Sequence, residues 1–391
     1  MDNYRAIREL FDQLKKKQIV CFGVGKHFKN ITYPFLRDSG LIKNLVAFTG
    51  TNSNKTITLD GEVYPAIPME DVATFIREDM EEVATFTRED MEEVATFTRE
   101  DTLILVAVTG YKEIISQIRA NDKLSQIEAI PSIYIEALYE DMLMLSADKP
   151  PANFRKNDRE VIPRVIHTFW FSGEHLPEKY QKCLDSWRKY APDFEIKIWN
   201  LDSYKPKGCT FFDQAIECEN WAFASDYARA DVLRKFGGVY MDLDVEMLRP
   251  IDDLLYNDAY MSFESLSRIE CGSGMGAKPG NKILDEICKS YEARPYLKAD
   301  GSWDNSTCPV RYTQVIEKHG LVKNGGFQFV NDITIYPFEV LTGKSFDSGI
   351  IYQTDLSYTT HHHNGNWVPE SAWQAMDQRY REIREFMAGR E

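Results

Sequence analysis

The sequence predicts an α/β protein of two domains, and three stretches carry this prediction. The apolar strand 18–22 is followed by a glycine turn and a helix, which is how a Rossmann-like nucleotide-binding unit begins. Two prolines in the segment 149–153 block helix and strand continuation and indicate a linker. A helix, a glycine pair and an alternating strand over residues 221–246 predict a second α/β unit. The expected organisation is a Rossmann-like domain over residues 1–150, a linker over 151–160 and the second domain over 161–391.

Composition and charge argue against a nucleic-acid partner, a disulfide framework and a transmembrane protein. Of the 391 residues, 43% are hydrophobic and 27% charged, as in ordinary globular proteins. A net charge of −15 argues against a nucleic-acid partner, because phosphates need a basic surface. The seven cysteines include no Cys-x-x-Cys pair, which is typical of thiols in a reducing compartment. No run has the length of a transmembrane helix, and the first residues lack the apolar core of a signal peptide. We therefore expect a cytoplasmic protein, with peripheral association at the inner face of a membrane left open.

The first domain alternates helices and strands. Residues 4–17 have the spacing of an amphipathic helix, and apolar strands are expected at 18–22, 45–49 and 103–109. The glycine turn after the first strand has Phe28 where a dinucleotide fingerprint has its third glycine. A bound dinucleotide and a structural or docking role both remain open for this domain.

Residues 69–101 contain three near-identical copies of an eleven-residue unit. Eleven residues make close to three helical turns, so successive copies would stack along one helical face. We interpret the repeat as an in-frame duplication that lengthens one helix. A tolerated insertion and a partner-binding arm are the two interpretations of its role.

The second domain is expected to begin with a strand ending near Trp170, followed by a helix over 177–190 and a strand over 194–199. Trp170 has two interpretations, a core tryptophan or a residue at the edge of the sheet that contacts a ligand. The alanine-rich stretch 221–236 then predicts a helix, which the pair Gly237–Gly238 ends.

The stretch after the glycine pair alternates apolar and polar residues from Val239 to Glu246, which predicts a single strand. Asp242 and Asp244 would then lie as neighbours on one face of that strand. Two carboxylates so close repel each other unless a cation lies between them. Hard divalent ions such as Mn²⁺ or Mg²⁺ prefer oxygen ligands of this kind. A solvated strand face is the alternative.

The spacing of polar residues around this strand resembles a known family. Ser225-Asp226-x-x-Arg229, followed by Gly237-Gly238-x-Tyr240-x-Asp242-x-Asp244, resembles the glycosyltransferases with a DXD sugar-binding motif, a group of bacterial polysaccharide and fungal mannosyl transferases. The stretch is also similar, more distantly, to the catalytic domain of the clostridial glucosylating toxins. The resemblance implies a GT-A-like fold that transfers a hexose, with retention of configuration, from a nucleotide diphosphate sugar to an oligosaccharide or lipid-linked glycan. It assigns the metal and the diphosphate to Asp242, Asp244 and Arg229, and donor contacts to Trp170, Ser225, Asp226 and Tyr240.

A run of histidines, His361 to His363, precedes Gly365 and Trp367. The family has a His-His-x-x-Gly-x-Trp loop here, and the spacing to Gly365 points to His362 as a third metal ligand. The resemblance further implies that Trp367 packs over the diphosphate or sugar. An exposed polar turn is the rival interpretation of the histidines.

Three other functions remain open at this point. The first is the same transfer onto a protein acceptor. The second is a nicotinamide-dependent oxidoreductase that uses Gly23 and Gly25 of the first domain. The third is a non-catalytic sugar-binding scaffold.

Overall fold

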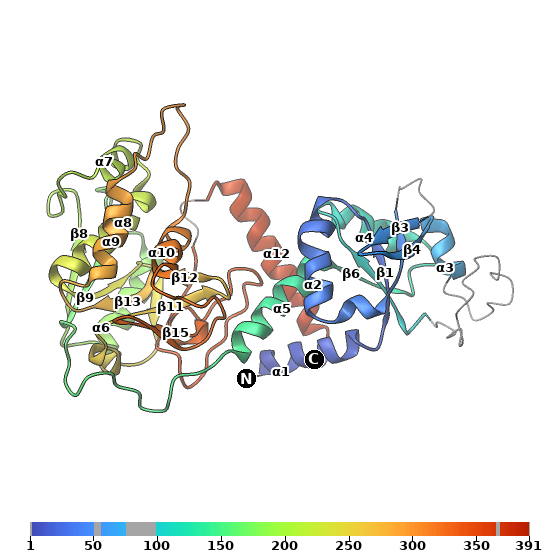
Figure 1. Ribbon diagram of the computed structural model, residues 1–391, viewed down its shortest axis with the longest axis horizontal. Coiled ribbons are helices and arrows are strands. Elements are labelled where there is room, and N and C mark those ends of the chain that lie inside the picture. The colour runs from blue at the N-terminus through green and yellow to red at the C-terminus, as the bar shows by residue number, and fades with distance from the viewer. Residues whose placement is uncertain (1, 51–55, 76–98, 365–367, 391) are drawn as a thin grey trace. The chain divides into compact units, whose positions relative to one another are not determined.

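The computed structural model describes residues 2–50, 56–75, 99–364 and 368–390 of the chain. They form two compact units, Asp2–Tyr139 and Glu140–Gly389, each with its own sheet (Figure 1). The division falls within helix α5 (Ser132–Ser146), ahead of the proline pair at which the sequence places the linker. Parallel and antiparallel strands both occur, so the chain is a mixed α/β protein, as its sequence predicts.

The first unit contains a six-stranded sheet with the order β3-β4-β2-β1-β5-β6. Strand β1 pairs in parallel with β2 on one side and with β5 on the other, and β3 alone runs antiparallel to its neighbour. Every residue of β5 is buried, as expected for a parallel strand covered on both faces. The strands are β1 (Gln18–Phe22), β2 (Leu45–Thr49), β3 (Thr56–Leu59), β4 (Glu62–Ile67), β5 (Thr102–Val106) and β6 (Glu128–Pro131).

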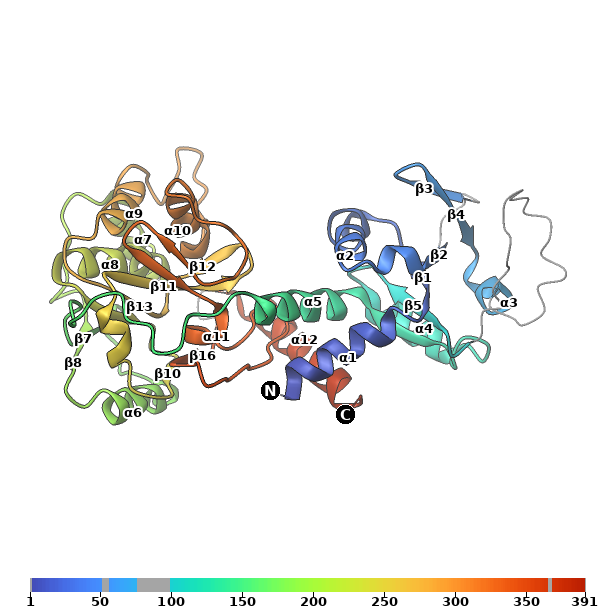
Figure 2. The same ribbon diagram turned by 60° about the horizontal axis from the view of Figure 1, so that its bottom comes forward.

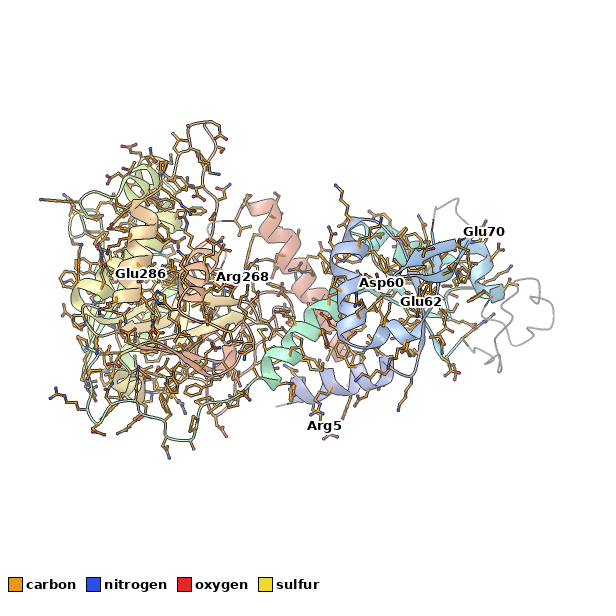
Figure 3. All side chains as sticks on the ribbon, viewed as in Figure 1. Arg5, Asp60, Glu62, Glu70, Arg268 and Glu286 are labelled. Atoms are coloured by element: carbon orange, nitrogen blue, oxygen red, sulfur yellow. The ribbon has the colours of Figure 1, made fainter. Side chains whose placement is uncertain are left out.

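Asp60 and Gly61 connect β3 to β4, and the exposed side chains of Asp60 and Glu62 are labelled in Figure 3. The φ angles of Asp60 and Gly61, 48° and 89°, are both positive, which is the backbone of a tight hairpin turn and the reason for an Asp-Gly pair. An exposed ion pair of 3.0 Å joins Asp60 to Arg37.

The helices of the first unit follow the predicted order. The amphipathic helix expected over 4–17 is α1 (Asp2–Leu14), and its apolar face is buried. The first copy of the repeat begins as a turn, Met69–Asp71, and α3 (Val72–Phe75), while residues 76–98 lie outside the described part of the chain. The lengthened helix therefore stays a prediction. The other helical segments are Phe28–Thr32, α2 (Tyr33–Asp38), Leu41–Asn44 and α4 (Tyr111–Ala120).

The second unit contains an eight-stranded mixed sheet with the order β14-β15-β11-β13-β9-β7-β8, and β12 pairs with β11. A separate two-stranded sheet joins β10 to β16. The strands are β7 (Val165–Phe169), β8 (Glu195–Trp199), β9 (Gly238–Met241), β10 (Val245–Met247), β11 (Ala259–Ser265), β12 (Arg268–Glu270), β13 (Ser273–Ala277), β14 (Gln328–Val330), β15 (Ile333–Tyr336) and β16 (Thr359–His361).

Helices cover both faces of the eight-stranded sheet (Figure 2). Helices α7, α8, α9 and α10 lie on one face and α6 on the other, and each face has its own apolar core. None of the helices within the described residues is long and apolar enough to cross a membrane. The helical segments are Glu178–Tyr180, α6 (Gln181–Tyr190), α7 (Thr210–Glu217), α8 (Trp221–Phe236), Asp252–Tyr256, α9 (Lys282–Glu292), α10 (Cys308–Glu317), α11 (Phe338–Leu341) and α12 (Glu370–Ala388).

Helix α8 ends where the glycine pair predicts. Gly237 and Gly238 have φ angles of 66° and 103°, which favour glycine. A Cβ atom on Gly238 would lie 2.6 Å from the carbonyl oxygen of Val165, and one on Gly237 would lie 2.7 Å from the ring of Pro279. The pair therefore lets the chain leave α8 and enter the sheet directly at β9.

The single strand predicted from Val239 to Glu246 is wrong. Strand β9 ends at Met241, residues 242–244 form a turn, and β10 begins at Val245 in the other sheet. The amide N–H of Val245 donates to the carbonyl oxygen of Asp242 at 3.0 Å, which closes the turn. Alternation alone could not reveal this break, because the two halves have the same period and differ only in their pairing partners.

Candidate active site

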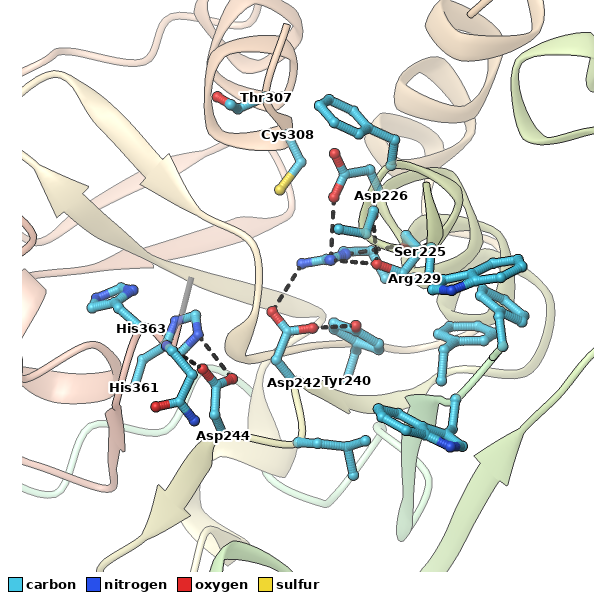
Figure 4. A pocket seen from close by; sticks show the side chains of 18 of the residues that line it. Ser225, Asp226, Arg229, Tyr240, Asp242, Asp244, Thr307, Cys308, His361 and His363 are labelled. Carbon is cyan, nitrogen blue, oxygen red and sulfur yellow. Dashed lines mark hydrogen bonds and ion pairs between the residues drawn. The ribbon is translucent and has the colours of Figure 1, made fainter. Parts of the chain in front are cut away.

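A cavity of about 510 Å³ opens at the ends of β7 and β9 in the second unit (Figure 4). Its lining includes the aromatic segment 169–171 after β7, the first half of α8 and the turn after β9. The N-terminal end of α10 also lines it, together with His361, His363 and Asn364. The cavity has the size of a small-ligand pocket and lies where α/β sheets bind ligands.

The guanidinium of Arg229 is the centre of the polar network in this cavity. Its Nη2 donates to the Ser225 hydroxyl at 2.9 Å and lies 3.2 Å from the Asp226 carboxylate, one helical turn earlier. Its Nη1 lies 3.4 Å from the Asp242 carboxylate across the cavity. The guanidinium also stacks over the Tyr240 ring, with 4.7 Å between the guanidinium carbon and the ring centroid. Arg229 is buried, so these contacts fix a full positive charge in the cavity wall.

Two carboxylates share this cation. Burial raises the pKa of Asp226 to about 6, and the neighbouring Arg229 offsets part of that rise. Asp242 is less buried than Asp226, and it accepts a hydrogen bond from the Tyr240 hydroxyl. Burial raises the pKa of Tyr240 well above its ordinary value, so its hydroxyl stays a donor. The wall formed by α8 thus carries the Arg229 cation, and the turn after β9 carries the Asp242 carboxylate that faces it.

Asp244 meets a histidine from a distant part of the chain. Strand β16 pairs with β10 so that His361 lies opposite Val245. The Nε2 atom of His361 lies 3.2 Å from the Asp244 carboxylate. Ligand atoms of Asp242, Asp244 and His361 lie within 4.8 Å of one another. These three residues could hold a metal ion.

His361 also belongs to a second group of residues that could hold a metal ion. Ligand atoms of Glu270, His361 and His363 also lie within 4.8 Å of one another, and all three residues are buried. Burial alone would lower the pKa of His361, but the charges of Asp244 and Glu270 raise it well above 6.5. Burial and the charge of His361 together lower the pKa of His363 to about 3. Both shifts favour a proton on His361 and none on His363, and a metal ion bound at Nε2 of His361 would displace that proton.

The comparisons with known proteins address this region of the chain. Residues 177–261 match the family model "Glycosyltransferase sugar-binding region containing DXD motif". The matched residues all lie in the second unit. The resemblance inferred from the sequence is thereby confirmed, and glycosyltransferase is the class of enzyme to which it points.

Three similar proteins are enzymes or suspected enzymes of this class. An inositol phosphoceramide mannosyltransferase of Schizosaccharomyces pombe is 30% identical over 34% of this chain and 38% of its own length. An uncharacterized glycosyltransferase of Acanthamoeba polyphaga mimivirus is 22% identical over 54% of this chain and 85% of its own. A mannosyl phosphorylinositol ceramide synthase of Saccharomyces cerevisiae is 24% identical over 56% of this chain and 62% of its own. The chain thus spans little more than a third of the fission-yeast protein.

Among solved structures, the PaToxG glycosyltransferase is similar over 42% of this chain and 72% of its own, with 20% identity and a TM-score of 0.31. A glycosyltransferase involved in glycosylation of the major capsid of PBCV-1 covers 56% of this chain and 98% of its own, with 9% identity and a TM-score of 0.30.

Most of the site residues assigned from the sequence lie within the matched region, residues 177–261. Ser225, Asp226, Arg229, Tyr240, Asp242, Asp244 and Trp170 all line the one cavity. Trp170 is partly buried beside Tyr180, and its indole N–H donates to the carbonyl oxygen of Glu174 at 2.7 Å. Trp367 and Gly365 lie outside the described residues.

His362 lies apart from the DXD carboxylates. Its Nε2 lies 3.0 Å from the Glu246 carboxylate, and its side chain is about a third exposed. Successive side chains of an extended chain point to opposite sides, so His361 faces Asp244 and His362 faces away. Within the described residues, the group that could hold a metal with Asp242 and Asp244 contains His361 rather than His362.

Sequence reasoning missed two further residues at the DXD carboxylates. Gly272 approaches Asp242 so closely that a Cβ atom there would lie 2.0 Å from the carboxylate oxygen. Glu270 accepts from the Gly272 amide at 2.6 Å and faces His361. Gly272 belongs to a glycine-rich stretch, a composition typical of a flexible loop, but the residues that follow it form the buried strand β13.

Proposed function

We propose that this chain transfers a hexosyl unit from a nucleotide diphosphate sugar to a glycan acceptor, with a divalent metal ion and with retention of anomeric configuration. The observation that carries the proposal is the convergence of Asp242, Asp244, His361 and Arg229 on one cavity. A donor of this kind carries a diphosphate, which requires several positive charges at its binding site.

The donor atoms at the site fit Mn²⁺ or Mg²⁺. Two carboxylates and one imidazole form a mixed oxygen and nitrogen set, which suits Mn²⁺ in particular. The Nδ1 atom of His361 lies 3.4 Å from the Glu270 carboxylate, a partner that would orient the ring with its Nε2 toward Asp244. When bound, the ion would supply positive charge to the departing nucleoside diphosphate.

The residues of the chain itself bind and orient the donor. Arg229 is held by Ser225 and Asp226 and presents a fixed cation to the same diphosphate. Asp226 accepts hydrogen bonds from ribose or sugar hydroxyls, and Trp170 and Tyr240 shape the nucleoside end of the pocket. Trp367 would pack over the diphosphate or sugar. We assign no separate general base, since a retaining transfer does not require one.

The names of the relatives bear on the sugar and the acceptor. Two of them are named for mannosyl transfer to an inositol-containing ceramide lipid. We infer that mannose is one of the donor sugars to test first, and that the acceptor is an oligosaccharide or a lipid-linked glycan of surface polysaccharide synthesis. Seven free thiols support a reducing compartment, so we place the reaction in the cytoplasm or at the inner face of its membrane.

We assign the catalytic role to residues 161–391 as a GT-A-like domain, and propose that residues 1–150 are a Rossmann-like domain. The support for the second assignment is a set of parallel strands that spreads outward from β1 in both directions. The repeat over residues 69–101 is proposed to be a lengthened connection.

The test is metal-dependent hydrolysis of nucleotide sugars. Purified protein is incubated with Mn²⁺ and a panel that includes the GDP, UDP and ADP sugars, and free nucleoside diphosphate is measured. We expect one donor to be hydrolysed, and Asp244→Asn to abolish this activity without unfolding. No hydrolysis of any donor would favour a sugar-binding scaffold. NADH oxidation that needs Gly23 would favour the oxidoreductase.

A further inference from the structure

The first unit has a cavity of its own. It measures about 450 Å³ and is formed by residues at the carboxyl ends of β1, β2 and β4, with Val108 after β5 as one wall. Strand β1 is the point where the strand order reverses, because β2 lies on one side of it and β5 on the other. Ligands of open α/β sheets bind beside that point. The cavity therefore has the place and the volume of a small-ligand site.

A buried hydroxyl in this cavity has no partner. Thr49, the last residue of β2, lines the cavity and is only 6% exposed. Its Oγ1 makes no hydrogen bond with any of the described residues. An unpaired buried hydroxyl is unfavourable. Because this atom is closed off from solvent, a ligand in the cavity would pair with it once the Thr49 side chain turned toward the cavity.

The polar end of the cavity suits an anion. Among the described residues, Lys29 is the one charged residue in its lining, although the chain as a whole carries a net charge of −15. The glycine turn after β1 forms the adjoining wall, and within the described residues its Val24 and Gly25 amides have no backbone acceptor. A Cβ atom on Gly25 would meet nothing within 4 Å, so the backbone there is open to a bound group. Free amides beside a lysine are donors of the kind that bind phosphate.

The remaining lining is apolar. No carboxylate is among the described residues that line the cavity. Aromatic and branched side chains surround the rest of it, namely Phe22, Phe48, Ile57, Ile67 and Val108. Such walls bind a flat, weakly polar ring, with a few polar groups fixing its orientation. The apolar and polar ends of the cavity together fit a ligand that has a flat ring at one end and a phosphate at the other.

We propose that this cavity binds a nucleoside phosphate, with the base among the apolar side chains, Thr49 hydrogen-bonded to the nucleoside and the phosphate held by Lys29 and the glycine turn. The turn is already positioned for this role. His27, which follows it, lies 3.3 Å from the Ser132 hydroxyl and 3.2 Å from the Glu136 carboxylate, both on α5. The site would be separate from the proposed donor site, and its nucleotide need not be the donor's.

The experiment is equilibrium calorimetry on the full chain with AMP, UMP and inorganic phosphate as probes. EDTA is present so that a metal-dependent donor site contributes no binding. We expect at least one nucleotide to bind, Lys29→Ala to weaken it about tenfold or more, and Thr49→Val to weaken it severalfold. Lys43→Ala, an exposed lysine of the same unit outside the cavity, is the matched control and should bind like wild type.

Each other outcome overturns the proposal. No saturable binding at millimolar nucleotide, or binding unchanged in both variants, would leave the cavity without this ligand. Inorganic phosphate bound as tightly as the nucleotides would remove the nucleoside from the proposal. Thermal unfolding checks the fold, and Thr49→Val should unfold at or above the wild-type temperature because it removes an unpaired hydroxyl. Mn²⁺-dependent donor hydrolysis should persist in Lys29→Ala, which separates this proposal from the proposed function.

Discussion

Replacing Gly272 with alanine should separate activity from stability. The new Cβ would lie 2.0 Å from the Oδ2 atom of Asp242 and 3.3 Å from Nη1 of Arg229. Gly272 has no positive φ, so the backbone accepts alanine without strain. The carboxylate is the end of a rotatable side chain and can turn aside. It must move by more than about 1 Å to reach ordinary contact distance, and a displacement of about 1 Å at a reacting centre lowers rates about 100-fold.

The assay compares donor hydrolysis and thermal unfolding for the same proteins. A 100-fold loss corresponds to about 2.7 kcal/mol of transition-state stabilisation, while the unfolding free energy should change by less than about 1 kcal/mol. Gly110→Ala is the matched control, because its Cβ would meet its nearest neighbour at an ordinary 3.5 Å. It should leave both quantities unchanged.

A double variant makes the test sharper. If Gly272→Ala acts by moving the Asp242 carboxylate, then adding it to Asp242→Ala should lower activity no further, since the group it displaces is gone. Additive losses would show that the alanine disturbs something else. Activity of Gly272→Ala within threefold of wild type would refute the assignment of Asp242 to the reaction.

Three further predictions follow from other parts of the chain. His361→Ala should weaken Mn²⁺ binding in calorimetry while His362→Ala leaves it unchanged, and the reverse order would restore the assignment made from sequence spacing. Removing residues 80–101 should leave unfolding temperature and donor hydrolysis nearly unchanged, and a loss of soluble protein would show that the repeat is part of the fold. Burial raises the pKa of Asp141 to about 7, so the folded chain keeps a proton that the unfolded chain releases, and stability falls as pH rises from about 4 to 7. Asp141→Asn should remove that fall and be up to about 4 kcal/mol more stable than wild type at pH 8, whereas parallel stability curves in denaturant would contradict it.

The local structure could be predicted wherever neighbouring residues decide it. Strands β1 and β2 have the predicted bounds, because short apolar runs between a helix and a turn leave few alternatives. Helix α8 ends at its glycine pair for a steric reason that the sequence displays. The polar spacing of Asp226 and Arg229 likewise places both on one helix face, and the structure joins them at 3.2 Å.

Features that depend on distant segments could not be predicted. The strand through Asp242 breaks because its second half pairs with β16, more than a hundred residues later. The choice between His361 and His362 depends on the register of that pairing, and a shift of one residue would exchange them. The role of Glu270 could not be predicted for the same reason, since only the fold brings it close to His361.

The break in the strand explains how two acidic residues from one short segment can serve one site. In a continuous strand, Asp242 and Asp244 would lie on one face of that strand, and Asp244 would not be turned toward β16. The turn instead leaves Asp242 at the end of β9, facing Arg229, and turns Asp244 toward β16, facing His361. The two carboxylates therefore meet partners from opposite sides of the cavity, one from α8 and one from the C-terminal strand. A substitution that straightened the turn would keep both aspartates and still separate Asp244 from His361, so the geometry of residues 242–244 matters to the site as much as their charge.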